Sequence, residues 1–155
     1  NFVSNRLKKI IYASSVDVFG PKLRATYTEE HPTAPETFYG ATKLFMERAY
    51  KIFCDKNKID LVTLRFSQIY GPGEHPINVI PVFVKKIVSK QPLNVFGKGE
   101  DTRSFLYVDD AVEAVRLALV TNKNGVFNVA GAKTASINEL IKTFQLVTGE
   151  PIKLR

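Results

Sequence analysis

The chain has 155 residues, of which 45% are hydrophobic and 24% are charged, a balance typical of one soluble globular unit. This balance excludes a disordered or collagen-like chain, and charged residues interrupt every apolar run well before the roughly 20 residues that a membrane span needs. The formal net charge of +7 comes from scattered lysines without interleaved aromatic residues, so we expect no nucleic-acid partner and no membrane partner.

The single cysteine and the N-terminal residues bear on the location of the protein. Cys54 cannot form an intramolecular disulfide, and its place in a helical pattern predicts a small buried residue. Near the N-terminus, the basic residues are followed only by the short apolar run at residues 10–13, which is too brief for a secretory signal. We therefore expect a cytoplasmic protein.

Apolar periodicity predicts alternating strands and helices along the first half of the chain. Residues 10–15 form a short β-rich run ending in two serines, which is typical of a buried parallel strand. Residues 20–37 are rich in proline and predict a loop, after which Thr37 can cap a helix over residues 38–57. Residues 61–66 predict the next strand.

The second half continues the alternation after a turn at residues 70–73. Asp109 can cap one helix, and Ser136 with Glu139 has capping-box spacing for another. The predicted helices span residues 79–90, 110–120 and 137–148, and the predicted strands span residues 93–96, 104–108 and 125–130. Phenylalanines within these apolar patterns are expected to fill the interior; they are Phe83, Phe96, Phe105, Phe127 and Phe144.

Strands that alternate with helices imply an α/β layered fold with a largely parallel sheet and right-handed crossovers. One feature of many such folds is missing, because no strand leads into a G-x-G-x-x-G loop that opens a helix. The segment Gly71-Pro72-Gly73 is no substitute, since it contains proline and opens no glycine-lined helix. The chain is therefore either half of a dinucleotide-binding protein or a protein that does not bind a dinucleotide alone.

Tyr39 and Lys43 carry the most suggestive chemistry. They stand four residues apart on a predicted helix, so both side chains project from one face. Tyrosine is ordinarily a poor base at neutral pH, and a neighbouring cation stabilises its phenolate. Ser14 and Ser15 end the preceding strand, where a hydroxyl can meet the same substrate atom. If the serines are left out of account, the alternative interpretation of Tyr39 and Lys43 is a surface tyrosine that packs beside a lysine.

Five motifs follow one another along nearly the whole chain: Ser14-Ser15-x-x-Val18-Phe19-Gly20, Tyr39-Gly40-x-x-Lys43, Leu64-Arg65-Phe66, Ile69-Tyr70-Gly71-Pro72-Gly73 and Arg103-Ser104-Phe105-x-Tyr107-Val108-x-Asp110. In this order and spacing they resemble the extended short-chain dehydrogenases/reductases, and most of all the nucleotide-sugar epimerases and dehydratases. The resemblance implies the C-terminal part of a Rossmann-like doubly wound parallel sheet plus a small α/β substrate-binding subdomain. Residues 1–75 would belong to the former and residues 76–155 mainly to the latter, with residues 103–131 partly returning to the main sheet.

The resemblance also implies roles for individual residues. Tyr39 would be the catalytic acid and base, Lys43 would hold the nicotinamide ribose and tune Tyr39, and Ser15 would hydrogen-bond the reacting hydroxyl. Gln68 stands where relatives usually carry an asparagine that touches substrate phosphate. Arg103 would contact the substrate diphosphate with its planar fork of donors, the alternative being a surface salt bridge.

Dehydratases of this family usually follow the catalytic hydroxyl with an Asp-Glu pair, whereas this chain has Val16 and Asp17 there. This difference disfavours a 4,6-dehydratase. Asp17 alone could still act as an auxiliary acid or base, the alternative being a loop-forming aspartate. His31 and His75 have no partner at metal-ligand spacing, so we expect no metal.

The function implied by the resemblance is NAD-dependent epimerisation of a nucleotide-activated sugar. Tyr39 would remove a hydroxyl proton, and a hydride would pass to the nicotinamide and return to the opposite face of the sugar. One alternative is an NAD(P)-dependent oxidoreductase of the same superfamily, and another is a non-catalytic fragment or interaction module without its own cofactor loop. The expected cofactor is NAD, with NADP as the alternative, and the expected partner is a nucleotide sugar.

A doubly wound sheet that begins with residues 10–15 would expose an unpaired strand edge and apolar surface beside it. We therefore expect that the chain belongs to a longer polypeptide with a further N-terminal segment, or that it pairs with another chain. In relatives, the helix that corresponds to residues 38–57 commonly forms a dimer interface, so the expected assembly is a homodimer.

Overall fold

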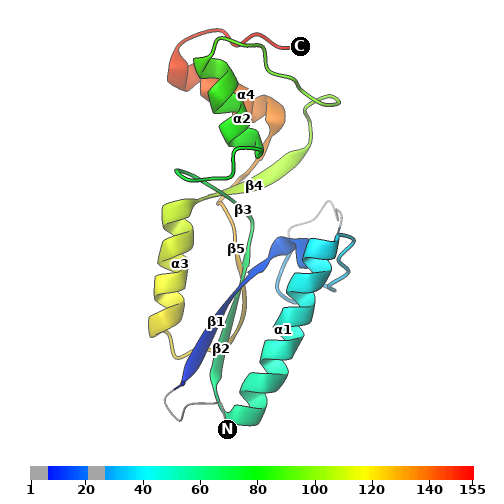
Figure 1. Ribbon diagram of the computed structural model, residues 1–155, viewed down its shortest axis with the longest axis vertical. Helices are drawn as coiled ribbons and strands as arrows, with labels where there is room; N and C mark the ends of the chain where they lie inside the picture. Colours follow the sequence, from blue (N-terminus) through cyan, green and yellow to red (C-terminus); the bar gives the residue numbers. More distant parts are fainter. Residues whose placement is uncertain (1–6, 21–26) are drawn as a thin grey trace. The chain divides into compact units, whose positions relative to one another are not determined.

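The protein is described by a computed structural model over residues 7–20 and 27–155, and it divides into two compact units (Figure 1). The first unit contains the described residues up to Ser67 together with Asp109–Ala130. The second unit contains Gln68–Val108 and Gly131–Arg155. Each unit has its own three-stranded sheet, and the two are described separately.

The sheet of the first unit is parallel, as predicted. Its strands are β1 (Lys9–Ser15), β2 (Asp60–Phe66) and β5 (Gly125–Val129), and they lie in the order β1-β2-β5. Ser15 is level with Phe66, which is in turn level with the last residue of β5. The carboxyl ends of all three strands therefore meet at one edge of the sheet.

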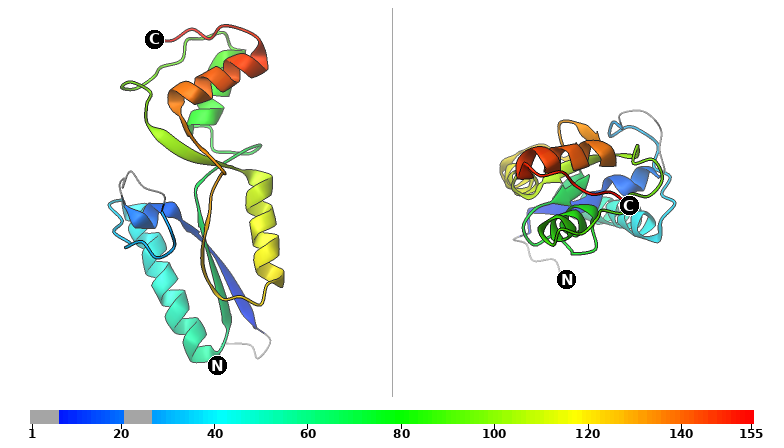
Figure 2. Two further views of the ribbon diagram at one scale, coloured as in Figure 1. Left: turned by 180° about the vertical axis from the view of Figure 1, so that it is seen from behind. Right: turned by 90° about the horizontal axis from the view of Figure 1, so that it is seen from above.

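One helix covers each face of this sheet (Figures 1 and 2): α1 (Phe38–Asn57) lies on one side and α3 (Val108–Val120) on the other. Side chains along β1 alternate between the two faces, as a strand requires. The hydroxyl of Ser14 donates to a carboxylate on α1, whereas the ammonium of Lys9 donates to the carbonyl of Ala118 on α3. The sheet is thus a central layer between two helices.

The helix α1 begins and ends where the sequence predicts. The Thr37 hydroxyl caps its N-terminus by accepting a hydrogen bond of 2.9 Å from the Gly40 N–H. At the other end, Lys58 adopts the left-handed conformation with φ 54°, which terminates the helix. Cys54 lies buried on this helix, also as predicted.

The first turn of α1 lies directly against η1 (Val16–Phe19), the short 3-10 helix that follows β1. A Cβ atom at Gly40 would lie 2.5 Å from the Asp17 carbonyl oxygen and 3.0 Å from Cβ of Pro35. Only a residue without a side chain allows this approach, because the nearer obstacle is backbone. Gly40 therefore sets how close the beginning of α1 comes to the end of β1.

The second unit is built on a mixed sheet. Its strands are β3 (Gln68–Tyr70), β4 (Thr102–Tyr107) and β6 (Thr134–Ser136), with β3 parallel and β6 antiparallel to β4. Two helices complete the unit, α2 (Val79–Val88) and α4 (Ile137–Thr148), which lie side by side in Figure 2. The capping box predicted at the start of α4 is present.

The core of the second unit forms where α2 and α4 meet the segment after α2. Phe83 on α2 and Ile141 on α4 are each 4% exposed, and Leu93 between them in sequence is fully buried. The Leu93 N–H donates to the Lys153 carbonyl at 2.8 Å. The C-terminal residues therefore close over this core.

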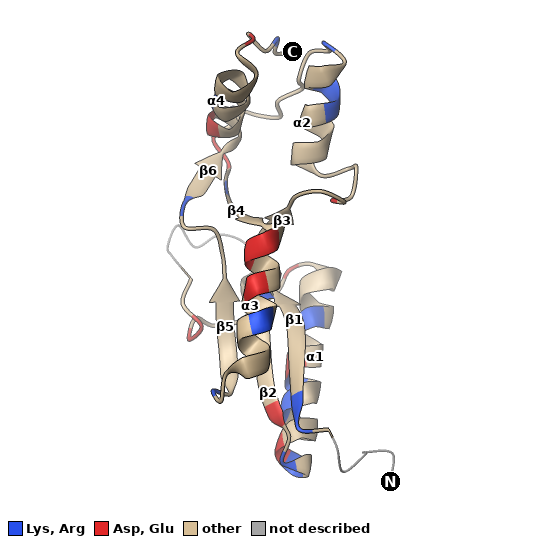
Figure 3. Ribbon diagram, turned by 90° about the vertical axis from the view of Figure 1, so that its left-hand side faces the viewer, with Lys and Arg blue, Asp and Glu red and all other residues tan. Residues whose placement is uncertain are grey.

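Three predictions about the second half of the chain are wrong. Residues 93–96 form no strand, because Leu93 makes only an isolated bridge with Leu154. Phe96 is 92% exposed rather than part of the interior. Asp109 does not cap α3, since this helix already begins at Val108; Asp109 and the next residue occupy its first turn, where acidic groups (Figure 3) face the positive end of the helix dipole.

Two short strands, β3 and β6, have three residues each and were not predicted. The other predicted strands and helices are confirmed to within about two residues at each end, which is the usual uncertainty of element boundaries. Over residues 7–20 and 27–155, no helix combines the length and apolar character needed to cross a membrane.

Replacing Leu93 by alanine should lower the free energy of unfolding by about 2–5 kcal/mol, because it leaves a cavity in a fully packed site. Urea denaturation followed by circular dichroism measures this loss. Leu146→Ala is the matched control, since Leu146 is 84% exposed and should change the free energy by less than about 0.5 kcal/mol. Equal losses in the two variants would contradict the assigned core.

Replacing Gly40 by alanine should destabilise the protein, although alanine is favoured over glycine by about 1 kcal/mol inside an ordinary helix. The reversed sign follows from the backbone oxygen 2.5 Å from the added Cβ. Thermal unfolding measures the effect, with Thr42→Ala at an exposed position of the same helix as the control. An unchanged or higher melting temperature for Gly40→Ala would show that α1 does not need this close approach.

Candidate functional site

The candidate site lies at the carboxyl edge of the sheet in the first unit. Ser15 ends β1 and is 8% exposed, whereas Tyr39 stands in the first turn of α1 and is 54% exposed. In parallel α/β sheets, ligands bind outside the carboxyl ends of the strands. A phenol that is accessible at this edge is therefore well placed to meet a bound molecule.

Lys43 connects α1 to β1. Its Nζ donates a hydrogen bond of 2.8 Å to the Ala13 carbonyl oxygen and lies 5.5 Å from the centroid of the Tyr39 ring. The predicted spacing thus brings the ammonium and the phenol together on one helix face. An ammonium has three N–H donors, and one is used by Ala13, so two remain for a ligand.

A second tyrosine lies equally near this ammonium. Lys43 Nζ is 5.5 Å from the centroid of the Tyr12 ring, and the Tyr12 hydroxyl donates to the Lys43 carbonyl at 3.4 Å. Burial is the main cause that raises the pKa of Tyr12, followed by the negative charge of Glu47. Tyr12 therefore stays protonated and packed against α1, which leaves Tyr39 as the accessible phenol.

Ser15 and Asp17 form the turn beside these groups. The Ser15 Oγ accepts a hydrogen bond of 3.2 Å from the Asp17 N–H, which caps the short 3-10 helix. The hydroxyl keeps its own O–H for donation, so Ser15 can still hydrogen-bond a ligand. The Asp17 side chain is exposed, and its backbone carbonyl is the group that Gly40 approaches.

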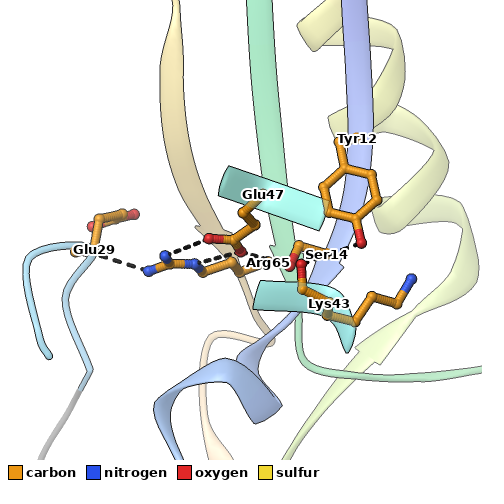
Figure 4. Close-up of polar contacts among 6 residues, drawn as sticks. All are labelled: Tyr12, Ser14, Glu29, Lys43, Glu47 and Arg65. Carbon is orange, nitrogen blue, oxygen red and sulfur yellow. Dashed lines mark hydrogen bonds and ion pairs between the residues drawn. The ribbon is translucent and has the colours of Figure 1, made fainter. Parts of the chain in front are cut away.

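A buried charged cluster lies on the α1 side of the sheet (Figure 4). Glu47 of α1 accepts hydrogen bonds from Ser14 Oγ at 2.6 Å, from Arg65 Nε at 2.9 Å and from Arg65 Nη2 at 2.7 Å. The side chains of Glu47 and Arg65 are only 7% and 5% exposed. We refer to Ser14, Glu47 and Arg65 as the buried cluster.

The guanidinium of Arg65 reaches beyond this cluster. Its Nη1 donates to the Glu29 carbonyl at 3.3 Å (Figure 4). Its Cζ lies 4.9 Å from the centroid of the Phe19 ring. The Glu29 carboxylate accepts a hydrogen bond from the Asn128 N–H, which lowers the pKa of Glu29. One arginine therefore connects β2 to α1 and to the loop before α1.

The two candidate phosphate ligands lie in the second unit. Gln68 is the first residue of β3, and Arg103 is exposed on β4, where its backbone pairs with Ala135 of β6. Within the described residues, no hydrogen bond or ion pair to another side chain holds the Arg103 guanidinium.

The loop before β4 is held in a defined conformation. Asn138 donates from its side chain to the Lys98 carbonyl at 2.9 Å and from its backbone to the Gly99 carbonyl at 3.1 Å. Gly97 and Gly99 both have positive φ, at 62° and 66°. Phe96 stands immediately before this loop, and its ring is exposed. An accessible aromatic side chain therefore lies next to a backbone segment that hydrogen bonds hold in place.

The sequence motifs contained Ser14 and Arg65 of the buried cluster but not Glu47, and they did not indicate its role. A signal was present, because Arg65 stands in a largely apolar strand, and a charge inside such a strand requires a partner. The partner could be sought on the helix face that carries Lys43, where Glu47 follows four residues later. Among residues 7–20 and 27–155, no group of three or more His, Cys, Asp or Glu side chains could hold a metal ion.

Comparison with known proteins identifies relatives of known activity. Human dTDP-D-glucose 4,6-dehydratase is 32% identical over 138 residues, which cover 88% of this chain and 39% of the relative. The structure of UDP-N-acetylglucosamine 4-epimerase from Methanobrevibacter ruminantium, in complex with UDP-N-acetylmuramic acid, superposes with a TM-score of 0.91 at 31% identity. The superposition covers 97% of this chain and 50% of the chain in that structure.

A second structure, UDP-glucuronic acid 4-epimerase from Bacillus cereus in complex with UDP-glucuronic acid and NAD, has a TM-score of 0.87 at 31% identity. It covers 95% of this chain and 48% of that structure, so the chain spans about half the length of both structures. The likeness confirms the predicted fold. The profile of the NAD dependent epimerase/dehydratase family matches residues 2–130, and the chain therefore belongs to this family of nucleotide-sugar epimerases and dehydratases.

Proposed function

We propose that the protein is an NAD-dependent epimerase of a nucleotide-activated sugar, with Tyr39 as the group that exchanges the proton. The observation that carries this proposal is the exposed Tyr39 phenol beside the Lys43 ammonium at the carboxyl edge of a parallel sheet. Relatives that act on UDP-sugars and bind NAD support the reaction class. The activity belongs to the native gene product that contains this sequence.

The residues at the edge of the first unit fit a nicotinamide nucleoside. The Lys43 ammonium has two N–H donors that are not used by Ala13, and a ribose diol offers two acceptor oxygens. Tyr39 stands one helical turn away, close enough to contact the same ribose. Bound NAD would supply the chemistry that the side chains lack, the acceptance and return of a hydride.

The protein side chains remove the proton of the sugar hydroxyl and return it. The Tyr39 oxygen removes the proton from a sugar hydroxyl and later returns it. The positive charge of Lys43 and the N-terminal end of α1 stabilise the negative charge that develops on this oxygen. Ser15 donates a hydrogen bond to the reacting oxygen, which fixes its distance from Tyr39. Inversion requires only that the sugar presents its other face before the hydride returns.

The second unit provides groups suited to the nucleotide part of the substrate. Arg103 has a planar fork of donors that matches diphosphate oxygens, and Gln68 offers an amide donor for a phosphate oxygen. Phe96 has an exposed ring of the kind on which a nucleotide base stacks. These three residues are the proposed substrate ligands.

The turn after Ser15 favours epimerisation over dehydration. Elimination of water from the sugar needs an acid and a base besides the phenol, and this turn has apolar Val16 followed by one carboxylate, Asp17. Asp17 is exposed and could assist proton transfer as an auxiliary group. A single carboxylate supplies only one of the two groups that dehydration requires.

The surface of α1 supports the proposed homodimer. Phe38, Phe45 and Ile52 recur every seven residues and are 91%, 69% and 70% exposed. Seven residues are close to two helical turns, so the three side chains form one apolar stripe. Such a stripe is suited to packing against the same stripe of a second copy.

Replacing Tyr39 by phenylalanine should lower kcat by about 10²- to 10⁴-fold, the usual contribution of a positioned acid or base. NAD affinity should change much less, because the ring remains. The assay incubates the native gene product with NAD and UDP-glucose, UDP-N-acetylglucosamine or UDP-glucuronic acid and resolves the product sugars by NMR. Calorimetry measures NAD binding.

Tyr12→Phe is the matched control, since it removes the other hydroxyl near Lys43 and should retain most of the activity. Equal losses in the two variants would contradict the assignment of Tyr39. Net formation of NADH without an epimeric sugar would indicate the alternative oxidoreductase. A 4-keto-6-deoxy product would instead indicate a dehydratase.

Replacing Phe45 by glutamate should convert the dimer to a monomer, because it places a charge in the centre of the apolar stripe. Light scattering coupled to gel filtration measures the mass of the native gene product. Lys51→Glu on another face of the same helix is the control and should leave the mass unchanged. A monomeric wild type would contradict the homodimer.

A further inference from the structure

We propose that the buried cluster of Ser14, Glu47 and Arg65 positions the catalytic pair, and that Arg65 offsets the negative charge of Glu47, which would otherwise oppose the effect of Lys43 on Tyr39. Glu47 and Arg65 are therefore positioning residues rather than catalytic residues. This inference rests on the proposed role of Tyr39 as the group that exchanges the proton.

The first argument is connectivity. The Glu47 carboxylate is joined to β1 through the Ser14 hydroxyl and to β2 through two parallel bonds from Arg65. The bidentate contact fixes orientation as well as distance, because both guanidinium nitrogens must meet both carboxylate oxygens. Arg65 also reaches the Glu29 carbonyl in the loop that leads into α1. The cluster thus holds the helix, two strands and the preceding loop.

The second argument is the rotation of α1 about its own axis, which decides which residues face the sheet. Tyr39, Lys43 and Glu47 follow at intervals of four residues, so they lie on one face of α1. A slip of α1 by one residue would rotate this face by about 100° and move Lys43 away from the Ala13 carbonyl of β1. The hydrogen bonds of Lys43 to Ala13 and of Glu47 to Ser14 attach to adjacent residues of β1. Together they permit a single register of the helix on the strand.

The third argument is that the cluster is a poor way to gain stability. Burying two charges costs desolvation that their attraction often fails to recover, and apolar residues of similar volume are frequently as stable. Buried ion pairs are best attested where they specify one arrangement among several. Glu47 and Arg65, both nearly inaccessible to solvent, fit that role.

The fourth argument is electrostatic. Glu47 lies one helical turn from Lys43, and an unpaired carboxylate there would oppose negative charge on the phenol of Tyr39. The charge of Glu47 still raises the pKa of Tyr12, after the larger effect of burial, so Arg65 offsets this charge only in part. Within residues 7–20 and 27–155, the charged and titratable groups that the elements packed on this part of α1 contribute include Tyr12 on β1, Asp17 in η1 and Arg65 on β2, beside Lys43 and Glu47 on α1 itself.

The decisive experiment separates positioning from folding. The triple variant Ser14→Ala, Glu47→Met, Arg65→Met replaces the whole cluster by apolar side chains, in the native gene product. We expect a melting temperature within a few degrees of the wild type and a kcat lower by about 10- to 100-fold, with KM changed less than threefold. A triple variant that folds and keeps full activity would overturn the positioning role.

The two single charge changes test the electrostatic part without any need for turnover. Carbon-13 NMR of labelled tyrosine follows ionisation of the Tyr39 phenol, whose signal is assigned by its absence in Tyr39→Phe. Arg65→Met leaves the Glu47 carboxylate alone, so the phenol should ionise at higher pH than in wild type. Glu47→Gln leaves the Arg65 cation alone, so it should ionise at lower pH. Shifts of the same sign would overturn the offsetting role.

Asp55→Asn is the matched control, because it breaks the exposed pair with Lys51 on the same helix. Both the NMR titration and kcat should match the wild type, since exposed pairs contribute little. The two proposals fail in different ways. A wild-type protein without activity on nucleotide sugars would overturn the proposed function, whereas the NMR titrations would still show whether Arg65 offsets the charge of Glu47.

Discussion

The bidentate contact between Arg65 and Glu47 is the interaction on which the first unit depends. It joins the middle strand of the sheet to the helix that carries Tyr39 and Lys43, and both partners are almost inaccessible to solvent. Removing either partner leaves an unpaired charge in an apolar layer, which costs about 3–5 kcal/mol. The helix therefore cannot slide or rotate on the sheet without breaking a contact that water does not replace.

Two further constraints complete the site at the edge of the sheet. The parallel register brings the ends of three strands to one level, and Ser15 stands at the end of β1. The absence of a side chain at Gly40 lets the start of α1 approach the backbone of Asp17. Backbone geometry thus places the first turn of α1, which carries Tyr39, against the turn that follows Ser15.

The main elements were predictable because their signals are local. The capping residues Thr37 and Ser136 and the apolar periodicity between them define helices with little help from the rest of the fold. The three-residue strands were not predictable, since β3 and β6 exist only through pairing with β4. Phe96 was misjudged because an apolar run around Leu93 does not reveal which of its residues turn outwards.

The site shows the same division between local and non-local information. The four-residue spacing of Tyr39 and Lys43 is visible in the sequence, whereas the pairing of Glu47 with Arg65 requires the packing of α1 on β2. The proposed role of Tyr39, the removal of a proton and its return to the same oxygen, requires the phenol in one place throughout both steps. A support built from buried charges meets this need, because its geometry is defined by hydrogen bonds, which are directional where apolar packing is not.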